Sequence, residues 1–174
     1  MDLAIFKIIH SLAGQSALLD NIGIFFANYF IYLIVAAGIF FVLKRKDNRE
    51  KTFVFIWTAL TMIVSRGLFT EIIRFLYVRQ RPFEVLGFTP LFDKFETAFP
   101  SGHAAFLFAL AFSVFYFNRK WGWWLLGVSL LNGLARVFVG IHWPGDILGG
   151  IIVAFIAFLI VKYLIKNYRP KEKT

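Results

Sequence analysis

Residues 22–43, IGIFFANYFIYLIVAAGIFFVL, contain no charged residue. They are long enough for a helix that crosses a bilayer, which needs about 20 mostly apolar residues. The rest of the chain has the same character: 59% of its residues are hydrophobic, 20% are aromatic and the mean hydropathy is +0.71. Soluble domains contain about 45–50% apolar residues. The sequence therefore predicts an integral membrane protein.

The predicted fold class is all-α, an integral membrane helical bundle of about five transmembrane helices in a single domain, 1–174. Residues 1–12, MDLAIFKIIHSL, are too short to cross a bilayer and combine charged with apolar side chains, which is typical of an interfacial helix. Residues 167–174 form a polar, cytoplasmic tail. The helical bundle occupies residues 22–166, and its predicted spans are 22–43, 53–78, 101–117, 121–139 and 144–166.

Positive charges are distributed unevenly between the loops. The formal net charge is +9, and most lysines and arginines lie in the 44–51 loop, in the pair Arg119 and Lys120, and from Lys162 onward. Loops rich in Lys and Arg stay in the cytoplasm, so we expect a plasma-membrane protein whose C-terminus is cytoplasmic. Because the basic residues adjoin apolar spans, they indicate membrane orientation and no nucleic-acid partner. There is no cysteine, hence no disulfide.

Three polar motifs fall on the side that this topology places outside the cell. They are RFLYVRQRP at 74–82, PSGH at 100–103 and RVFVGIHWPGD at 136–146. The topology rests on loop charges alone, so the agreement in side is independent of the motifs. Ionisable residues at the membrane level are costly and usually face a polar cavity. The motifs therefore indicate one shared pocket that faces outward.

Arg74 and Arg81 are seven residues apart, about two helical turns, so both side chains point to the same side. Two guanidinium groups suit a tetrahedral oxyanion, because each offers a fork of donors. The simpler alternative is that they extend to the lipid headgroups and that Arg74 pairs with Glu71. Arg66 lies inside its span. It either faces the bundle interior as a structural ion pair, which we favour, or contributes to a deep substrate channel. Its spacing of five residues to Glu71 is poor for a helical ion pair.

The motif PSGH begins an apolar helix. Ser101 can cap that helix, and Gly102 leaves the backbone open to a close ligand. The N–H groups at a helix N-terminus favour a bound phosphate, and His103 would lie in the first turn beside it. A plain capped helix with an interfacial histidine is the simpler alternative.

His142 and Asp146 are four residues apart, with Pro144 between them, and can meet across the first turn of the last helix. A carboxylate bonded to one ring nitrogen fixes the tautomer and makes the other nitrogen a better nucleophile or base. An ordinary helix junction with a salt bridge between Arg136 and Asp146 is the alternative. Anion binding explains the arginines, whereas a nucleophile and an acid are what phosphoester cleavage requires.

The three motifs resemble the signature of the type-2 phosphatidic acid phosphatase superfamily: Lys-x6-Arg-Pro, Pro-Ser-Gly-His and Ser-Arg-x5-His-x3-Asp. The resemblance extends over about residues 53–165. Arg74 replaces the usual Lys, which keeps the charge but changes the hydrogen-bond geometry. Ala135 replaces the usual Ser and removes one hydroxyl contact to phosphate. The matching segments are Arg74-x6-Arg81-Pro82, Pro100-Ser101-Gly102-His103 and Ala135-Arg136-x5-His142-x3-Asp146.

The resemblance implies a phosphatase in which His142 attacks phosphorus and becomes a phosphohistidine. Asp146 would orient and activate His142, and His103 would protonate the leaving oxygen and then help water to attack. No metal and no cofactor is implied, and no set of carboxylates for Mg²⁺ lies near the motifs. The implied phosphate-binding residues are Arg74, Arg81, Ser101, Gly102 through its backbone N–H, and Arg136.

Size and helix count resemble the small bacterial undecaprenyl pyrophosphate phosphatases, which act on a carrier lipid of wall synthesis at the outer face. We therefore expect cleavage of undecaprenyl pyrophosphate to undecaprenyl phosphate and phosphate, with the lipid and the bilayer as partners. The alternatives are a phosphatidylglycerophosphate or phosphatidic acid phosphatase and, in another class, a non-catalytic anion or lipid transporter. The 83–99 loop is expected to cover the site or to contact the lipid chain. Gly145, Gly149 and Gly150 are expected to permit close packing of the last helix on a neighbour, with flexibility of the site as the alternative.

Overall fold

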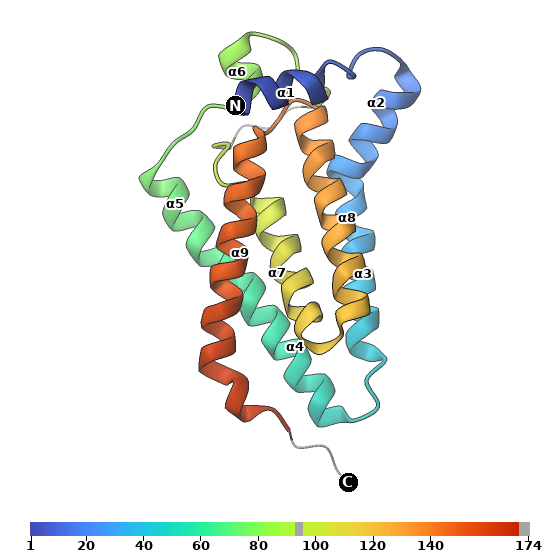
Figure 1. Cartoon of the computed structure of the whole chain (residues 1–174), viewed down its shortest axis with the longest axis vertical. Helices are drawn as coiled ribbons and strands as arrows, with labels where there is room; N and C mark the ends of the chain where they lie inside the picture. Colours follow the sequence, from blue (N-terminus) through green and yellow to red (C-terminus); the bar gives the residue numbers. More distant parts are fainter. Residues whose placement is uncertain (93–95, 171–174) are drawn as a thin grey trace.

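The computed structural model describes residues 1–92 and 96–170, and all regular structure within these ranges is helical. Figure 1 shows a bundle of long helices that run side by side, with a short helix lying across one end. Two segments, η1 and η2, are π-helical, and η3 is a 3₁₀ turn. The helices in chain order are α1 Asp2–His10, α2 Ala17–Ile24, η1 Phe25–Tyr29, α3 Phe30–Leu43, α4 Asn48–Met62, η2 Ile63–Phe69, α5 Thr70–Leu76, α6 Pro82–Leu86, α7 Gly102–Phe117, α8 Arg119–Phe138, α9 Pro144–Ile165 and η3 Lys166–Tyr168.

Within the described residues, three helices are long and apolar enough to cross a membrane, judged by length and composition. Ala17–Leu43 joins α2, η1 and α3; Asn48–Leu76 joins α4, η2 and α5; and Pro144–Tyr168 joins α9 and η3. The helix α7 is apolar but shorter. The prediction of an all-α membrane bundle is confirmed, whereas the count of five spans stays a prediction.

Capping side chains set the starts of the long helices, and the apolar runs begin later. The first long helix begins at Ala17 and not at residue 22, because Ser16 Oγ accepts a hydrogen bond from the N–H of Leu19. The second begins at Asn48, because the Asp47 carboxylate accepts from the N–H of Glu50 at 3.0 Å. Hydropathy marks the part of a helix that enters lipid, so it misses these polar first turns.

The helix α7 is the centre of the bundle and packs against α3, α4, α8 and α9. Small residues allow this close packing, as predicted for Gly150, whereas Gly145 lies against Asp2 and Arg79 and Gly149 against Phe99. A Cβ added to Gly150 on α9 would lie 2.7 Å from Ala104 Cβ and 2.8 Å from the Ser101 carbonyl oxygen. The start of α9 therefore lies against the start of α7, which brings two of the polar motifs together.

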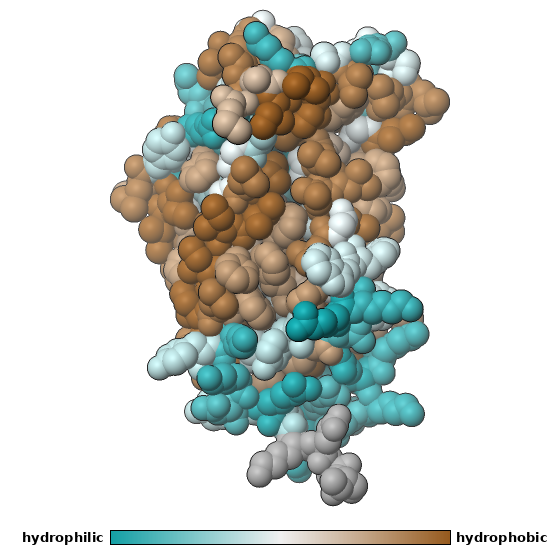
Figure 2. All heavy atoms as spheres, in the orientation of Figure 1, coloured by the Kyte–Doolittle hydropathy of each residue, from teal (hydrophilic) through white to brown (hydrophobic). Residues whose placement is uncertain are grey.

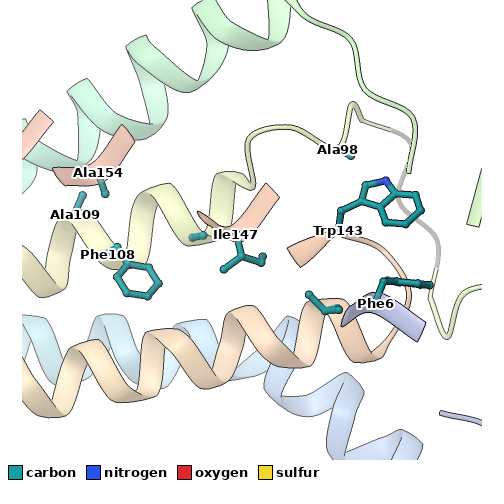
Figure 3. Close-up of a cluster of buried hydrophobic side chains, with 9 residues drawn as sticks. Phe6, Ala98, Phe108, Ala109, Trp143, Ile147 and Ala154 are labelled. Carbon is teal, nitrogen blue, oxygen red and sulfur yellow. The ribbon is translucent and has the colours of Figure 1, made fainter. Parts of the chain in front are cut away.

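The first helix lies across the end of the bundle where α8 stops and α9 starts (Figure 1). Its buried side chain is Phe6, whose ring centroid lies 5.1 Å from that of Trp143 and 5.0 Å from that of His10. Figure 3 shows Phe6 beside Trp143 at one end of a buried cluster that continues through Ile147 and Phe108. The helix α1 thus packs on the loop that carries the third polar motif.

The surface of the bundle is divided into a wide apolar belt and a hydrophilic end (Figure 2). The hydrophilic end in this view is the one at which α3 joins α4, α7 joins α8, and α9 ends (Figure 1). These junctions carry the basic 44–51 loop, Arg119 and Lys120, and, in the described part of the C-terminal segment, Lys162, Lys166 and Arg169. The three basic segments therefore share one end, and the polar motifs lie at the other.

Candidate active site

A cavity of about 240 Å³ lies at the end of the bundle that carries the three motifs. Its walls come from helices that are far apart in the sequence. Apolar Ile31 and Phe106 and polar Glu96 contribute to it, as does Arg66, which lies outside the motifs. Of the predicted site residues, those that line the cavity are Arg74, Arg81, Gly102, His103, Arg136 and His142.

His142 lies in the loop between α8 and α9 and is paired with Asp146 in the first turn of α9. The distance from His142 Nδ1 to Asp146 Oδ2 is 3.2 Å, and both side chains are buried. The same carboxylate oxygen accepts a hydrogen bond from the N–H of Trp143 at 2.8 Å. A carboxylate can only accept here, so Nδ1 carries the proton and Nε2 keeps its lone pair.

Burial lowers the pKa of His142 well below its ordinary value of 6.5. The positive charges of Arg136 and Arg81 lower this pKa further. His142 is therefore neutral at pH 7, with an unprotonated ring nitrogen available for nucleophilic attack or base catalysis.

Arg79 binds the second oxygen of Asp146, a contact that sequence analysis missed. Its Nη1 donates to Asp146 Oδ1 at 2.7 Å, and its Nη2 donates to Asp2 Oδ2 at 2.5 Å. Asp2 Oδ1 also accepts from the N–H of Gly145 at 2.8 Å. Burial acts to lower the pKa of Arg79, but the bond to Asp2 and the charge of Asp146 outweigh it and raise the pKa. The helix α1 is thus fastened to the residue that orients His142.

This arrangement differs from the simpler alternative for the third motif. In the described part of the chain, the arginine paired with Asp146 is Arg79, and the Arg136 side chain bonds elsewhere. Sequence spacing gave no signal for these contacts, because Arg79 lies 67 residues from Asp146 and 77 residues from Asp2. Arg79 belongs to the quoted stretch 74–82, but nothing in that stretch indicates its partners.

Arg81 does not share a helix with Arg74, contrary to the prediction from their spacing of two helical turns, because α5 ends at Leu76 and Arg81 directly precedes α6. Arg81 is completely buried and supports the loop that holds His142. Its Nη1 donates to the Ile141 carbonyl at 2.6 Å, and its Nε donates to the Glu96 carbonyl at 2.6 Å. Burial lowers the pKa of Arg81, and the charge of Arg74 lowers it further. An arginine titrates so far above neutrality that it still carries its charge. Arg81 therefore positions the loop and also brings positive charge to the cavity wall.

Arg74 joins the end of α5 to the turn before α7. Its Nη2 donates to the Pro100 carbonyl at 3.2 Å, and its Nη1 lies 3.1 Å from Glu96 Oε2. The pairing with Glu71 foreseen as an alternative is present but loose, at 3.8 Å. Arg74 is thus placed beside PSGH and not extended toward lipid headgroups.

The PSGH motif is a helix start, as its sequence suggests. Ser101 Oγ accepts a hydrogen bond from the N–H of Ala104 at 3.5 Å, and the Ser101 N–H donates to the Asp146 carbonyl at 3.0 Å. Ser101 is buried and does not line the cavity, whereas Gly102 and His103 do. The placement gives Ser101 a capping contact and leaves the cavity-facing positions to Gly102 and His103.

Arg136 is held by the first π-helical segment. A π-helix bonds residues five apart, and such segments interrupt the regular α-helical hydrogen-bond pattern. Arg136 Nη1 donates to the Ala27 carbonyl at 2.7 Å, and Asn132 Nδ2 donates to the Phe26 carbonyl at 2.6 Å. Among the described residues, the buried Arg136 Nε has no hydrogen-bond partner. A buried donor without a partner at a cavity wall is suited to an anionic ligand.

The second π-helical segment explains why Arg66 pairs with Glu71 in spite of their spacing in the sequence. Its Nη1 pairs with Glu71, five residues along the chain. The spacing is poor in an α-helix, but η2 spans Ile63–Phe69, and the π period brings residues five apart onto the same face. The structural ion pair is therefore present, and the same arginine also lines the cavity.

The 83–99 loop is only partly described, because residues 93–95 lie outside the described ranges. Glu96 lines the cavity, and Phe88 packs on the rings of Phe6 and His10. The short helix α6 in this loop has Pro82 at its first position, and Glu84 caps the N–H of Arg81 at 2.6 Å. Within the described residues, no group of three or more His, Asp or Glu side chains could hold a metal ion.

Comparison with known protein families matches residues 55–170 to the PAP2 superfamily. The chain is 31% identical over 167 residues to the undecaprenyl-diphosphatase BcrC of Bacillus subtilis, covering 94% of this chain and 84% of BcrC. It is 28% identical over 180 residues to an undecaprenyl-diphosphatase of Sulfolobus acidocaldarius, covering 99% of this chain and 82% of that protein. The crystal structure of Aquifex aeolicus LpxE shares the fold, with a TM-score of 0.76 at 23% identity, covering 93% of this chain and 94% of LpxE.

Proposed function

Because the chain belongs to the PAP2 superfamily, we propose that it removes the terminal phosphate from a lipid diphosphate through a phosphohistidine on His142. The observation that carries the proposal is the buried His142–Asp146 pair beside a cavity lined by arginines. A site that only binds an anion would need the arginines but not the His142–Asp146 pair. A neutral histidine held by a carboxylate is the arrangement of a nucleophile.

In the first step, His142 Nε2 attacks the terminal phosphorus, and the bond from phosphorus to the bridging oxygen breaks. The imidazole becomes positively charged as the phosphorus–nitrogen bond forms, and Asp146 stabilises this charge through Nδ1–H. The hydrogen bond from Arg79 holds the Asp146 carboxylate in that position. His103, in the first turn of α7, donates a proton to the departing oxygen.

In the second step, water cleaves the phosphohistidine. His103 has lost its proton and accepts one from the attacking water, which regenerates both histidines and releases inorganic phosphate. The phosphoryl oxygens are held by Arg74, Arg81 and Arg136 and by the Gly102 N–H at the start of α7. The unpartnered Arg136 Nε supports this role, since a phosphoryl oxygen would satisfy it. Positive charge from these groups replaces a metal ion in the proposal.

We propose undecaprenyl diphosphate as the lipid and the outer face of the plasma membrane as the side of reaction. The apolar belt supports a substrate that stays in the bilayer. The three basic segments lie at the end opposite the cavity, and basic loops stay in the cytoplasm. The curated relatives named above are undecaprenyl-diphosphatases, which supports the choice of lipid.

The test is release of inorganic phosphate by the purified full-length protein in detergent with EDTA. Undecaprenyl diphosphate, phosphatidylglycerophosphate and phosphatidic acid are compared at equal surface concentration. The proposal expects the diphosphate to give the highest kcat/KM. No release from any lipid would support an anion or lipid transporter, and dependence on added Mg²⁺ would contradict the metal-free mechanism.

A further inference from the structure

Four arginines line the cavity, and one of them does not belong to the three motifs. Arg66 lines it together with Arg74, Arg81 and Arg136, yet it comes from η2, outside every motif. A single phosphoryl group has three non-bridging oxygens, and the motif arginines with the Gly102 N–H already provide donors for them. The fourth arginine is therefore available for a second anionic group.

Arg66 lies directly against the start of α7. A Cβ built on Gly102 would lie only 2.5 Å from Arg66 Nε, so the absence of a side chain at Gly102 makes room for the guanidinium. Phe106, one turn further along α7, lines the same cavity. The guanidinium is thus placed next to the helix start, with an apolar wall beyond it.

Arg66 lies deeper in the bundle than Arg74, the motif arginine on the same continuous helix. Arg66 and Arg74 belong to the continuous helix Asn48–Leu76, whose last residues reach the motif end of the bundle. Eight residues correspond to roughly 12 Å along a helix axis. Arg66 therefore enters the cavity from a deeper level, the level at which a lipid chain would leave the site.

Part of the Arg66 guanidinium is available for a ligand. Its Nη1 pairs with Glu71, and among the described residues this is the hydrogen bond that the guanidinium makes. An anionic ligand in the cavity can therefore bind Nε and Nη2, while the pair with Glu71 keeps Arg66 in place.

We propose that Arg66 binds the lipid-proximal phosphate of a diphosphate ester, while the motif residues hold the terminal phosphate that His142 attacks. When the bond to the bridging oxygen breaks, that oxygen stays on the lipid-proximal phosphate, and Arg66 neutralises the charge that develops there. The inference rests on the proposed function and makes Arg66 a determinant of diphosphate over monophosphate substrates.

Two substrates that differ by a single phosphate test this role. Farnesyl diphosphate and farnesyl phosphate share the same lipid chain, and the release of inorganic phosphate from each is measured with the full-length protein in detergent. We expect Arg66→Gln to lower kcat/KM for the diphosphate by about tenfold or more, the effect of a lost charge-assisted hydrogen bond, and for the monophosphate by less than about threefold. Inhibition by inorganic pyrophosphate should weaken more than inhibition by phosphate.

Arg45→Gln is the matched control. Arg45 also pairs with a glutamate five residues along, Glu50, at 3.1 Å, but at the opposite end of the bundle. Its loss should leave the ratio of the two kcat/KM values unchanged. Arg66→Lys, which keeps the charge, should retain part of the preference, and Glu71→Gln, which frees Arg66, should lower KM for the diphosphate.

Equal losses on both substrates in Arg66→Gln, with an unchanged thermal midpoint, would overturn the inference. If Arg66→Gln does not fold, Arg66→Lys and Glu71→Gln are compared with the wild type instead. An unchanged preference for the diphosphate in both variants would then overturn the inference. Wild-type protein that hydrolyses neither substrate nor any lipid phosphate would instead contradict the proposed function. The two failures are therefore distinguishable.

Discussion

Arg79 donates a 2.7 Å hydrogen bond to Asp146 on the carboxylate oxygen opposite to the one that faces His142. Asp146 is consequently held from both sides, by the loop and by an arginine that is itself fixed by Asp2. A carboxylate fixed in this way cannot rotate away from the imidazole. In the proposed mechanism, the position of the first helix would therefore affect the rate of the chemical step.

Asp2→Asn is expected to lower kcat by about tenfold with little change in KM, because one charge-assisted hydrogen bond on Arg79 is lost while the phosphate-binding arginines remain. The measurement is steady-state phosphate release from the preferred lipid. Asp20→Asn is the control, since Asp20 also accepts a backbone hydrogen bond, from Gly14 at 2.9 Å, at an exposed position. A rise in KM alone would contradict the positioning role of Asp2.

His142→Gln is expected to abolish turnover and the covalent intermediate. Protein that has reacted with ³²P-labelled substrate and is then denatured in alkaline SDS should carry an acid-labile, base-stable phosphate in the wild type and none in the variant. His10→Gln is the control, because His10 Nδ1 lies 2.7 Å from the Phe138 carbonyl and does not line the cavity. Label retained in His142→Gln would mean that another residue is the nucleophile.

The pH profile should show no loss of activity as pH falls through 6.5. The folded-state pKa of His142 lies well below its ordinary value because of burial and then of the charges of Arg136 and Arg81, so the nucleophile stays unprotonated there. Below about pH 6.5 the unfolded chain binds a proton that the folded protein does not, so the free energy of unfolding should decrease as pH falls. A midpoint near 6.5 in kcat/KM, assigned to His142 by NMR, would contradict this prediction.

Gly150→Ala is expected to destabilise the bundle by about 1–3 kcal/mol through overpacking, because the new methyl group would meet Ala104 and the Ser101 carbonyl. Gly127→Ala on α8 is the matched control, since a Cβ there has nothing within 4 Å. That change should stabilise by about 0.5–1 kcal/mol through helix propensity. Thermal unfolding in detergent measures both, and equal midpoints would contradict the close contact of α7 and α9.

Sequence reasoning located the cavity because its main residues lie in motifs with regular spacing. The distance from His142 to Asp146 follows from a first helical turn, and the capping role of Ser101 follows from a helix start. Such relationships are local, so residue order is sufficient to predict them. The roles assigned to these residues in the reaction remain predictions.

Other parts of the site depend on contacts between distant segments, which motif spacing does not predict. Arg79 and Asp2 meet only because α1 folds across the end of the bundle, and Glu96 reaches the cavity from a loop. The spacing of five residues between Arg66 and Glu71 is poor for an ion pair only where the helix has the α-helical period. Hydrophobic runs in a membrane helix carry no signal for a local change of helical period.

The two π-helical segments have a consequence for comparing related proteins. Each segment accommodates its residues in fewer turns than an α-helix would, so a relative with regular α-helix there would align with a one-residue gap. We expect such a gap within 63–69 to turn the side chain at the position of Arg66 away from the cavity, even where the arginine is kept. The length of this segment, and not the identity of one residue, would then show which members of the family have this arginine at the site.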